Sequence, residues 1–140
     1  MATLRSHTVI DADADVVWRV LSDGANVADW FPAMAESTGD AEGRTVTLRD
    51  GSKLEEAVVT KDAYLRRFQY RVVGGDLAVE HHLGTVDVID LGNGSCLVVY
   101  GTEIEPESTA AAFDGAIGEA VANLPAFFAR RHGIGAAPTA

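Results

Sequence analysis

The most constraining feature of the sequence is one long amphipathic segment near its C-terminus, from Glu107 to His132. Apolar residues recur along it at spacings of three and four, which is the period of one face of a helix. They are Phe113, Ala116, Ile117, Ala120, Val121, Leu124, Phe127 and Phe128. The spacing predicts a helix about 39 Å long, with Gly133 as its C-cap. A long helix with a single apolar face needs a broad apolar surface to cover it.

Composition narrows the class of protein. The 140 residues are enough for one domain, which buries about two-thirds of its unfolded surface. The single cysteine, Cys96, excludes a disulfide framework within the chain. A net charge of −10 repels phosphate backbones and anionic lipids, so nucleic acid is disfavoured as a partner. Because we find neither a signal peptide nor a transmembrane-length apolar stretch, we predict a cytoplasmic protein that does not insert into membranes.

Upstream of the long helix, the sequence alternates strand patterns with tight turns. Leu4–Ile10 is predicted as an opening strand, followed by a short helix with Asp13 as N-cap and a second over Asn26–Phe31. Turn signals such as Asp50-Gly51 then separate further strands. These strands are predicted at Ala35–Gly39, Arg44–Arg49, Lys53–Lys61, Arg66–Val73, Val79–Asp90 and Ser95–Glu105.

Together these elements predict an α+β protein with a helix-grip fold. A curved antiparallel sheet of six to seven strands would wrap around the long C-terminal helix, with two short helices after the first strand. The sequence shows no internal repeat and no linker. We therefore predict one ligand-binding domain over residues 1–134 and a disordered tail over residues 135–140.

The predicted inward face of the sheet is unusual because it mixes polar with apolar side chains. The inward polar residues are Arg44, Glu56, Tyr70, His82, Tyr100 and Thr102. Burying so many polar groups is unfavourable unless they pair or border a cavity, so we favour a small-molecule pocket. The alternative is that Arg44 and Glu56 form a structural ion pair while the tyrosine hydroxyls reach the sheet edge.

This pocket would lie between the sheet and the C-terminal helix. The candidate ligand-binding residues are Trp30, Phe31, Met34, Arg44, Phe68, Tyr100, Phe113 and Ile117. The candidate acid–base residues are Glu56, His82 and Tyr70, since an apolar cavity shifts such groups toward useful pKa values. A pair with Arg44 would lower the pKa of Glu56 and make it an anchor, whereas an unpaired Glu56 would have a raised pKa. We favour the anchor.

Metal and cofactor chemistry find little support in the sequence. His81 and His82 are adjacent on a predicted strand, so they point to opposite faces and cannot share a metal ion. We find no cysteine pair, no phosphate-cradling glycine-rich loop after a strand and no Gly-x-Ser-x-Gly elbow. We therefore predict that the protein uses neither a metal nor a cofactor.

Several short motifs resemble those of a known superfamily. They are Val16-Val17-Trp18, Val27-Ala28-Asp29-Trp30-Phe31-Pro32, Arg44-Thr45-Val46, Asp50-Gly51 with Leu54 and Glu56, then Asp62, Phe68 and Tyr70. With the order of the elements from Thr3 to Arg131, they resemble the Bet v 1-like or START-like (SRPBCC) superfamily. Within it, the chain is similar to the bacterial polyketide cyclase/dehydrase family. Members of the superfamily include aromatases, cyclases, lipid and hormone carriers and proteins with no known ligand.

Three functional hypotheses are consistent with the residues and the resemblance. The favoured one is a protein that binds a hydrophobic small molecule, such as a polyketide, a lipid or an aromatic metabolite. The second is a cofactor-independent cyclase or aromatase that uses acid–base residues in the same cavity. The third is a structural or partner-binding protein whose cavity is filled. The sequence carries no signal for the oligomeric state.

Overall fold

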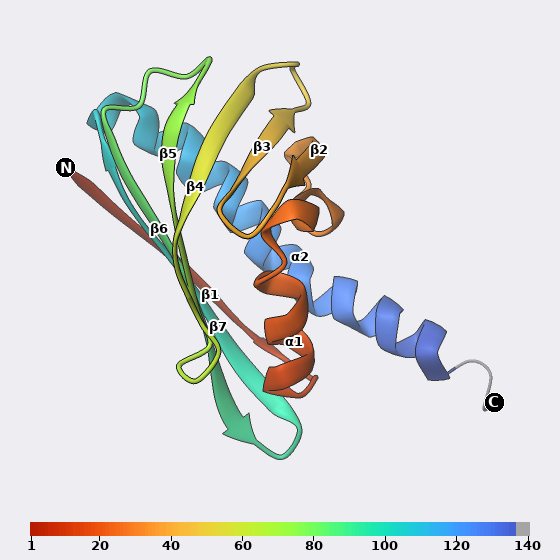
Figure 1. Ribbon diagram of the computed structural model, residues 1–140. Helices are drawn as coiled ribbons and strands as arrows, with labels where there is room; N and C mark the ends of the chain where they lie inside the picture. The colour runs from red at the N-terminus through yellow and green to blue at the C-terminus, as the bar shows by residue number, and fades with distance from the viewer. Residues whose placement is uncertain (137–140) are drawn as a thin grey trace.

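The computed structural model shows a curved seven-stranded antiparallel sheet with one long helix lying across its inner face (Figure 1). It describes residues 1–136, with side chains as far as Arg131. The strands are β1 (Ala2–Ile10), β2 (Met34–Gly39), β3 (Gly43–Leu48), β4 (Lys53–Asp62), β5 (Arg67–Gly75), β6 (His81–Gly92) and β7 (Ser95–Glu105). The helices are α1 (Ala14–Leu21), the 3₁₀ segments η1 (Gly24–Asp29) and η2 (Glu107–Thr109), and α2 (Ala110–Ala136).

The strand order explains why the two short helices come where they do. Across the sheet the order is β1-β7-β6-β5-β4-β3-β2, and every neighbouring pair is antiparallel. Strands β1 and β2 therefore occupy opposite edges, and α1 and η1 carry the chain from one edge to the other (Figure 1). Helix α2 packs mainly against β1 and β7. The predicted helix-grip fold is confirmed.

The core lies between the concave face of the sheet and α2. Alternate residues of each strand are buried, as in β7, where Cys96, Val98 and Tyr100 are inward. From α2, Leu124 and Phe128 are nearly inaccessible to solvent. Each such side chain stabilises the fold by about 1.5–3 kcal/mol relative to exposure. The period-two pattern therefore predicted the buried face of the sheet correctly.

The C-terminal helix differs from the prediction at both of its ends. The stretch after Pro106 begins with the 3₁₀ turn η2, and α2 starts only at Ala110. Helix α2 then continues through Gly133 to Ala136, so Gly133 is not its C-cap. A glycine inside a helix is unfavourable by only about 1 kcal/mol, which does not by itself end a helix. Of the predicted tail, residues 135 and 136 belong to α2, and 137–140 lie outside the described residues.

Smaller differences occur at turns and caps. Asp13 occupies the N-cap of α1, but its side chain makes no capping hydrogen bond. The second predicted helix is the 3₁₀ segment η1, two residues earlier than expected. Arg66 has a φ of 55° and lies in the turn before β5, where Asp62 accepts hydrogen bonds from two backbone N–H groups.

Within residues 1–136, no helix is long and apolar enough to cross a membrane.

Candidate functional site

A small cavity of about 110 Å³ lies between the inner face of β3–β5, the residues that follow η1 and the first half of α2. Its lining residues are Phe31, Ala33, Met34, Leu48, Leu54, Glu56, Tyr70, Leu77, Ala112, Phe113, Ala116 and Ile117. Apart from Glu56 and the tyrosine hydroxyl, their side chains are apolar. An apolar cavity of about 150 Å³ can hold benzene. In this conformation the cavity therefore has room for at most one small ring.

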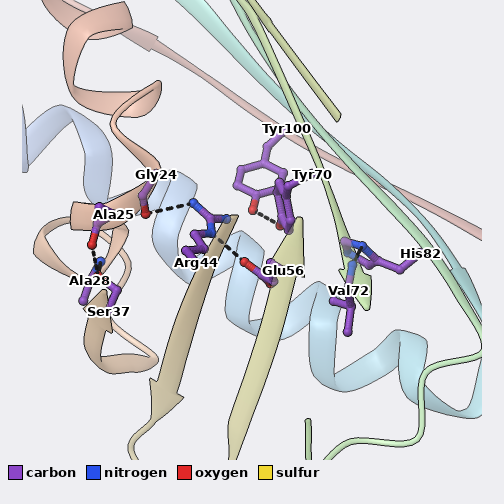
Figure 2. Close-up of polar contacts among 10 residues, drawn as sticks. All are labelled: Gly24, Ala25, Ala28, Ser37, Arg44, Glu56, Tyr70, Val72, His82 and Tyr100. Atoms are coloured by element: carbon purple, nitrogen blue, oxygen red, sulfur yellow. Dashed lines mark hydrogen bonds and ion pairs between the residues drawn. The ribbon is translucent and has the colours of Figure 1, made fainter. Parts of the chain in front are cut away.

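The main polar group in the wall is Glu56, which is held by Arg44. The two residues are directly opposite each other in the register of β3 and β4. The Nε of Arg44 donates to Oε1 of Glu56 at 2.6 Å, and both side chains are only 3% exposed. The guanidinium also donates to the Gly24 carbonyl at 3.4 Å and lies 4.5 Å from the centre of the Tyr70 ring. Arg44 is thus a buried cation behind the wall, with Glu56 at the surface of the cavity. Figure 2 shows the two side chains directed toward each other from β3 and β4.

Burial raises the pKa of Glu56, although the charge of Arg44 and its hydrogen bond act in the opposite direction. This direction differs from the lowered pKa that the sequence led us to expect for a paired carboxylate. The pairing itself is as predicted, but a single hydrogen-bonded cation does not offset the almost complete loss of water around the carboxylate. Glu56 is therefore both an anchor for Arg44 and a carboxyl that takes up a proton more readily than usual.

Two tyrosines form a second polar pair beside Arg44. The hydroxyl groups of Tyr70 and Tyr100 are hydrogen bonded to each other in the interior (Figure 2). Gly84 lies opposite Tyr70 in the β5–β6 register, and a Cβ there would overlap the Tyr70 ring. Burial raises the pKa of Tyr100 to about 12 and that of Tyr70 well above its usual value. Both hydroxyls therefore stay protonated at neutral pH, and neither reaches the sheet edge.

His82 is fully buried on β6, next to the cavity wall. Its Nδ1 accepts the backbone N–H of Val72 at 3.2 Å, which places the imidazole hydrogen on Nε2. Burial lowers the pKa of His82 to about 4, and nearby positive charges contribute in the same direction. Its ring centre lies 5.2 Å from that of Tyr70 and 5.8 Å from that of Phe113. His82 is thus a neutral imidazole that contacts two lining residues.

A family model described as "Polyketide cyclase / dehydrase and lipid transport" matches residues 1–129. The protein belongs to this family. The match includes every residue that lines the cavity. Among curated proteins, none matches the chain.

Several solved structures share the fold of this polyketide cyclase/dehydrase family member. The protein XoxI from Bacillus cereus is 20% identical, with a TM-score of 0.84 over 91% of this chain and 96% of that one. The di-domain ARO/CYC protein BexL is 18% identical, with a TM-score of 0.76 over 91% and 46%. Norcoclaurine synthase from Thalictrum flavum, in complex with dopamine and hydroxybenzaldehyde, is 22% identical, with a TM-score of 0.65 over 88% and 85%. At these identities the likeness shows the fold alone.

The structure brings about half of the predicted site residues to the cavity surface. The predicted residues that line it are Phe31, Met34, Glu56, Tyr70, Phe113 and Ile117. Those that are buried outside the lining are Trp30, Arg44, Phe68, His82 and Tyr100. Their functional roles stay predictions.

Six lining residues were not predicted as site residues: Ala33, Leu48, Leu54, Leu77, Ala112 and Ala116. Because side chains alternate along a strand, Leu48 and Leu54 share the inner face with Arg44 and Glu56. The helix period places Ala116 on the apolar face of the C-terminal helix. Leu77 lies in the β5–β6 connection, where no periodic pattern could have identified it. Within the described residues, no group of three or more His, Cys, Asp or Glu side chains could hold a metal ion.

Proposed function

We propose that this family member binds a small, largely apolar molecule, about the size of one aromatic ring, in the cavity between β3–β5 and α2. The observation that carries the proposal is the cavity itself, whose wall is apolar except at Glu56 and the Tyr70 hydroxyl. Apolar walls with a few convergent polar groups are typical of small-molecule sites. A filled structural core would not leave a ring-sized space beside a buried carboxyl.

The size of the space selects among the ligand classes that the sequence suggested. A lipid chain or a folded polyketide occupies several times the volume of one ring, whereas drug-sized ligands use pockets of about 300–1,000 Å³. An aromatic metabolite of one ring needs the least rearrangement of the lining. The complex of norcoclaurine synthase with hydroxybenzaldehyde supports this choice as an analogy, because that protein has the same fold and was solved with a one-ring aldehyde.

A second candidate function, cyclase or aromatase chemistry, is favoured by the raised pKa of Glu56. A carboxyl whose pKa is closer to neutrality transfers protons more effectively at neutral pH. Its position in the wall puts it within reach of a bound ring. Tyr70 would contribute a hydrogen bond from a protonated hydroxyl, and His82 would first need access to the ligand.

Binding can be tested with toluene and phenol as probes, using amide chemical shifts to locate the site. We expect saturable shifts confined to β3–β5, the residues after η1 and the first half of α2. Ala116→Leu should fill the cavity and abolish these shifts. Ala111→Leu is the matched control, because Ala111 is an exposed residue of the same helix outside the lining. Unsaturable shifts, or shifts that persist in Ala116→Leu, would refute the proposal.

Catalysis requires a separate experiment. The protein would be incubated with a poly-β-ketone thioester and the products analysed by mass spectrometry, with Glu56→Gln as the comparison. Turnover that Glu56→Gln removes while ring binding persists would establish the enzyme. Ring binding without turnover on such substrates would favour a carrier.

A further inference from the structure

Three buried side-chain atoms have no hydrogen-bond partner among the described residues: Trp30 Nε1, His82 Nε2 and Thr102 Oγ1. All three can donate a hydrogen. The indole N–H is a donor only, the Thr102 hydroxyl carries a hydrogen, and the bond from Val72 to Nδ1 leaves the imidazole hydrogen on Nε2. A buried donor without an acceptor is unfavourable and rare in folded proteins. The interior therefore offers donors for which the described chain supplies no acceptor.

Of these three, His82 is the one most closely associated with the cavity. Its ring lies against the aromatic rings of two lining residues, Tyr70 and Phe113, whereas the Trp30 ring lies against one lining aromatic ring, that of Phe31. Figure 2 shows the imidazole extending from β6 toward Val72 on β5, the strand that also carries Tyr70. Phe113, on the first turn of α2, is only partly buried. Phe113 contacts His82 and also lines the cavity, so rotation of its side chain would bring His82 closer to the cavity.

We propose that His82 recognises the ligand by donating its Nε2–H to a carbonyl oxygen on the ring compound. This inference rests on the proposed function, because it names a chemical group of the molecule in the same cavity. It assigns a specific role in ligand recognition to a residue that the sequence analysis named as an inward polar residue and a candidate acid–base catalyst. The bond from the Val72 N–H to Nδ1 fixes the tautomer that points a donor away from β5.

The chemistry of the wall favours a neutral carbonyl over other acceptors. An alcohol can accept from His82, but it brings its own hydrogen into an interior that already has excess donors. A carboxylate would bring a second negative charge next to Glu56, which is itself poorly solvated. A ketone or aldehyde oxygen accepts without donating and carries no charge. It therefore matches both the donor and the surrounding charge.

The test uses two ligands of the same planar shape, acetophenone and α-methylstyrene, in which a CH₂ group replaces the carbonyl oxygen. His82→Asn keeps an acceptor near the position of Nδ1 for the Val72 N–H but has no donor near the position of Nε2. We expect His82→Asn to weaken the binding of acetophenone roughly tenfold relative to the binding of α-methylstyrene. This is the size of effect expected for the loss of one buried hydrogen bond. Comparing ratios between variants cancels the difference in ligand hydration.

Two further variants separate recognition from general effects on packing. His82→Gln places an amide N–H near the position of Nε2 and should restore part of the acetophenone preference. Thr102→Val removes another unpartnered hydroxyl with little change in shape, and it should leave the ratio unchanged. If the asparagine variant does not fold, ¹⁵N-labelled histidine in the unmodified protein decides the question. The Nε2 resonance of His82 should then move with acetophenone and not with α-methylstyrene.

The outcomes distinguish this inference from the function on which it rests. If both ligands bind and the ratio is the same in His82→Asn, recognition by His82 is refuted while ring binding stands. A histidine Nε2 resonance that responds equally to both ligands refutes it too. If neither ligand and no smaller ring binds, the proposed function fails and this inference fails with it.

Discussion

Replacing Arg44 with methionine would remove the cation that holds Glu56 inside the protein. Both side chains are 3% exposed, so water does not take the place of the lost partner. Methionine keeps an apolar stem like that of arginine but lacks the guanidinium, which lies 4.5 Å from the centre of the Tyr70 ring. Removing one partner of a buried ion pair typically destabilises a protein by about 3–5 kcal/mol. We therefore expect a loss of this size in the free energy of unfolding near neutral pH.

The loss should depend on pH in a direction set by Glu56. Burial raises its pKa in the folded protein above the ordinary value of a glutamate, and Arg44 partly opposes this shift. A raised folded pKa means that the folded state binds the proton more tightly, so stability is lost as pH rises through the folded pKa. Without Arg44 the folded pKa should rise further. The destabilisation by Arg44→Met should therefore shrink as pH is lowered from about 8 to about 5.

Urea unfolding of both proteins across this pH range would measure the difference. Arg67→Met is the matched control, because Arg67 pairs with Asp87 on the outer face and is 43% exposed. A surface pair of this kind contributes about 1 kcal/mol or less. The double variant Arg44→Met/Glu56→Met should recover most of the stability, since a buried pair can be replaced by apolar residues. A loss no larger than that of Arg67→Met, or one independent of pH, would refute this account of the pair.

Other predictions concern packing and pH. Tyr100→Trp should lower the free energy of unfolding by about 1–3 kcal/mol by overpacking. Tyr100 is 1% exposed and lies outside the cavity lining, so the larger ring has no space to enter. Unchanged stability in a denaturant titration would instead show that there is free volume next to this side chain. Gly84→Ala should displace the Tyr70 ring and destabilise the protein. Gly115→Ala should instead stabilise α2 by about 1 kcal/mol, because an added Cβ there meets nothing within 4 Å. Equal effects of the two substitutions on the melting temperature would contradict this. Burial lowers the pKa of His82 in the folded protein from 6.5 to about 4, so its contribution to stability should be lost as pH falls through that interval. A His82 ring resonance that titrates near pH 6.5 would contradict this.

The fold could be predicted because the sequence carries two separate hydrophobic patterns, one with the period of a strand and one with the period of a helix. Strands that alternate every second residue and a helix with one apolar stripe fix which sides must meet. The turn at Asp50-Gly51 predicted that the strands carrying Arg44 and Glu56 are neighbours. The structure adds that the two residues are directly opposite each other. Element ends were less predictable. Arg66 could not be assigned to a turn from its residue type, because a positive φ is unusual for arginine.

The site was harder to predict because lining a cavity depends on depth as well as direction. Tyr70 and Tyr100 both face inward, yet only Tyr70 lines the cavity. Tyr100 lies deeper in the core, where its ring packs between Trp30, Phe31 and Tyr70. The direction of the Glu56 pKa shift was missed for the same reason. Sequence spacing identified its partner, but the loss of hydration depends on how much of the fold covers it.

The position of the cavity follows from the distribution of side-chain size along α2. The helix residues that line it are Ala112, Phe113, Ala116 and Ile117, so small and large side chains alternate there. Further along, bulky residues such as Leu124 and Phe128 are buried and fill the space beneath the helix. The alanine side chains are too short to fill the space between the helix and the concave inner face of β3–β5. The helix therefore closes the core with its C-terminal half and leaves room for a ligand beneath its N-terminal half.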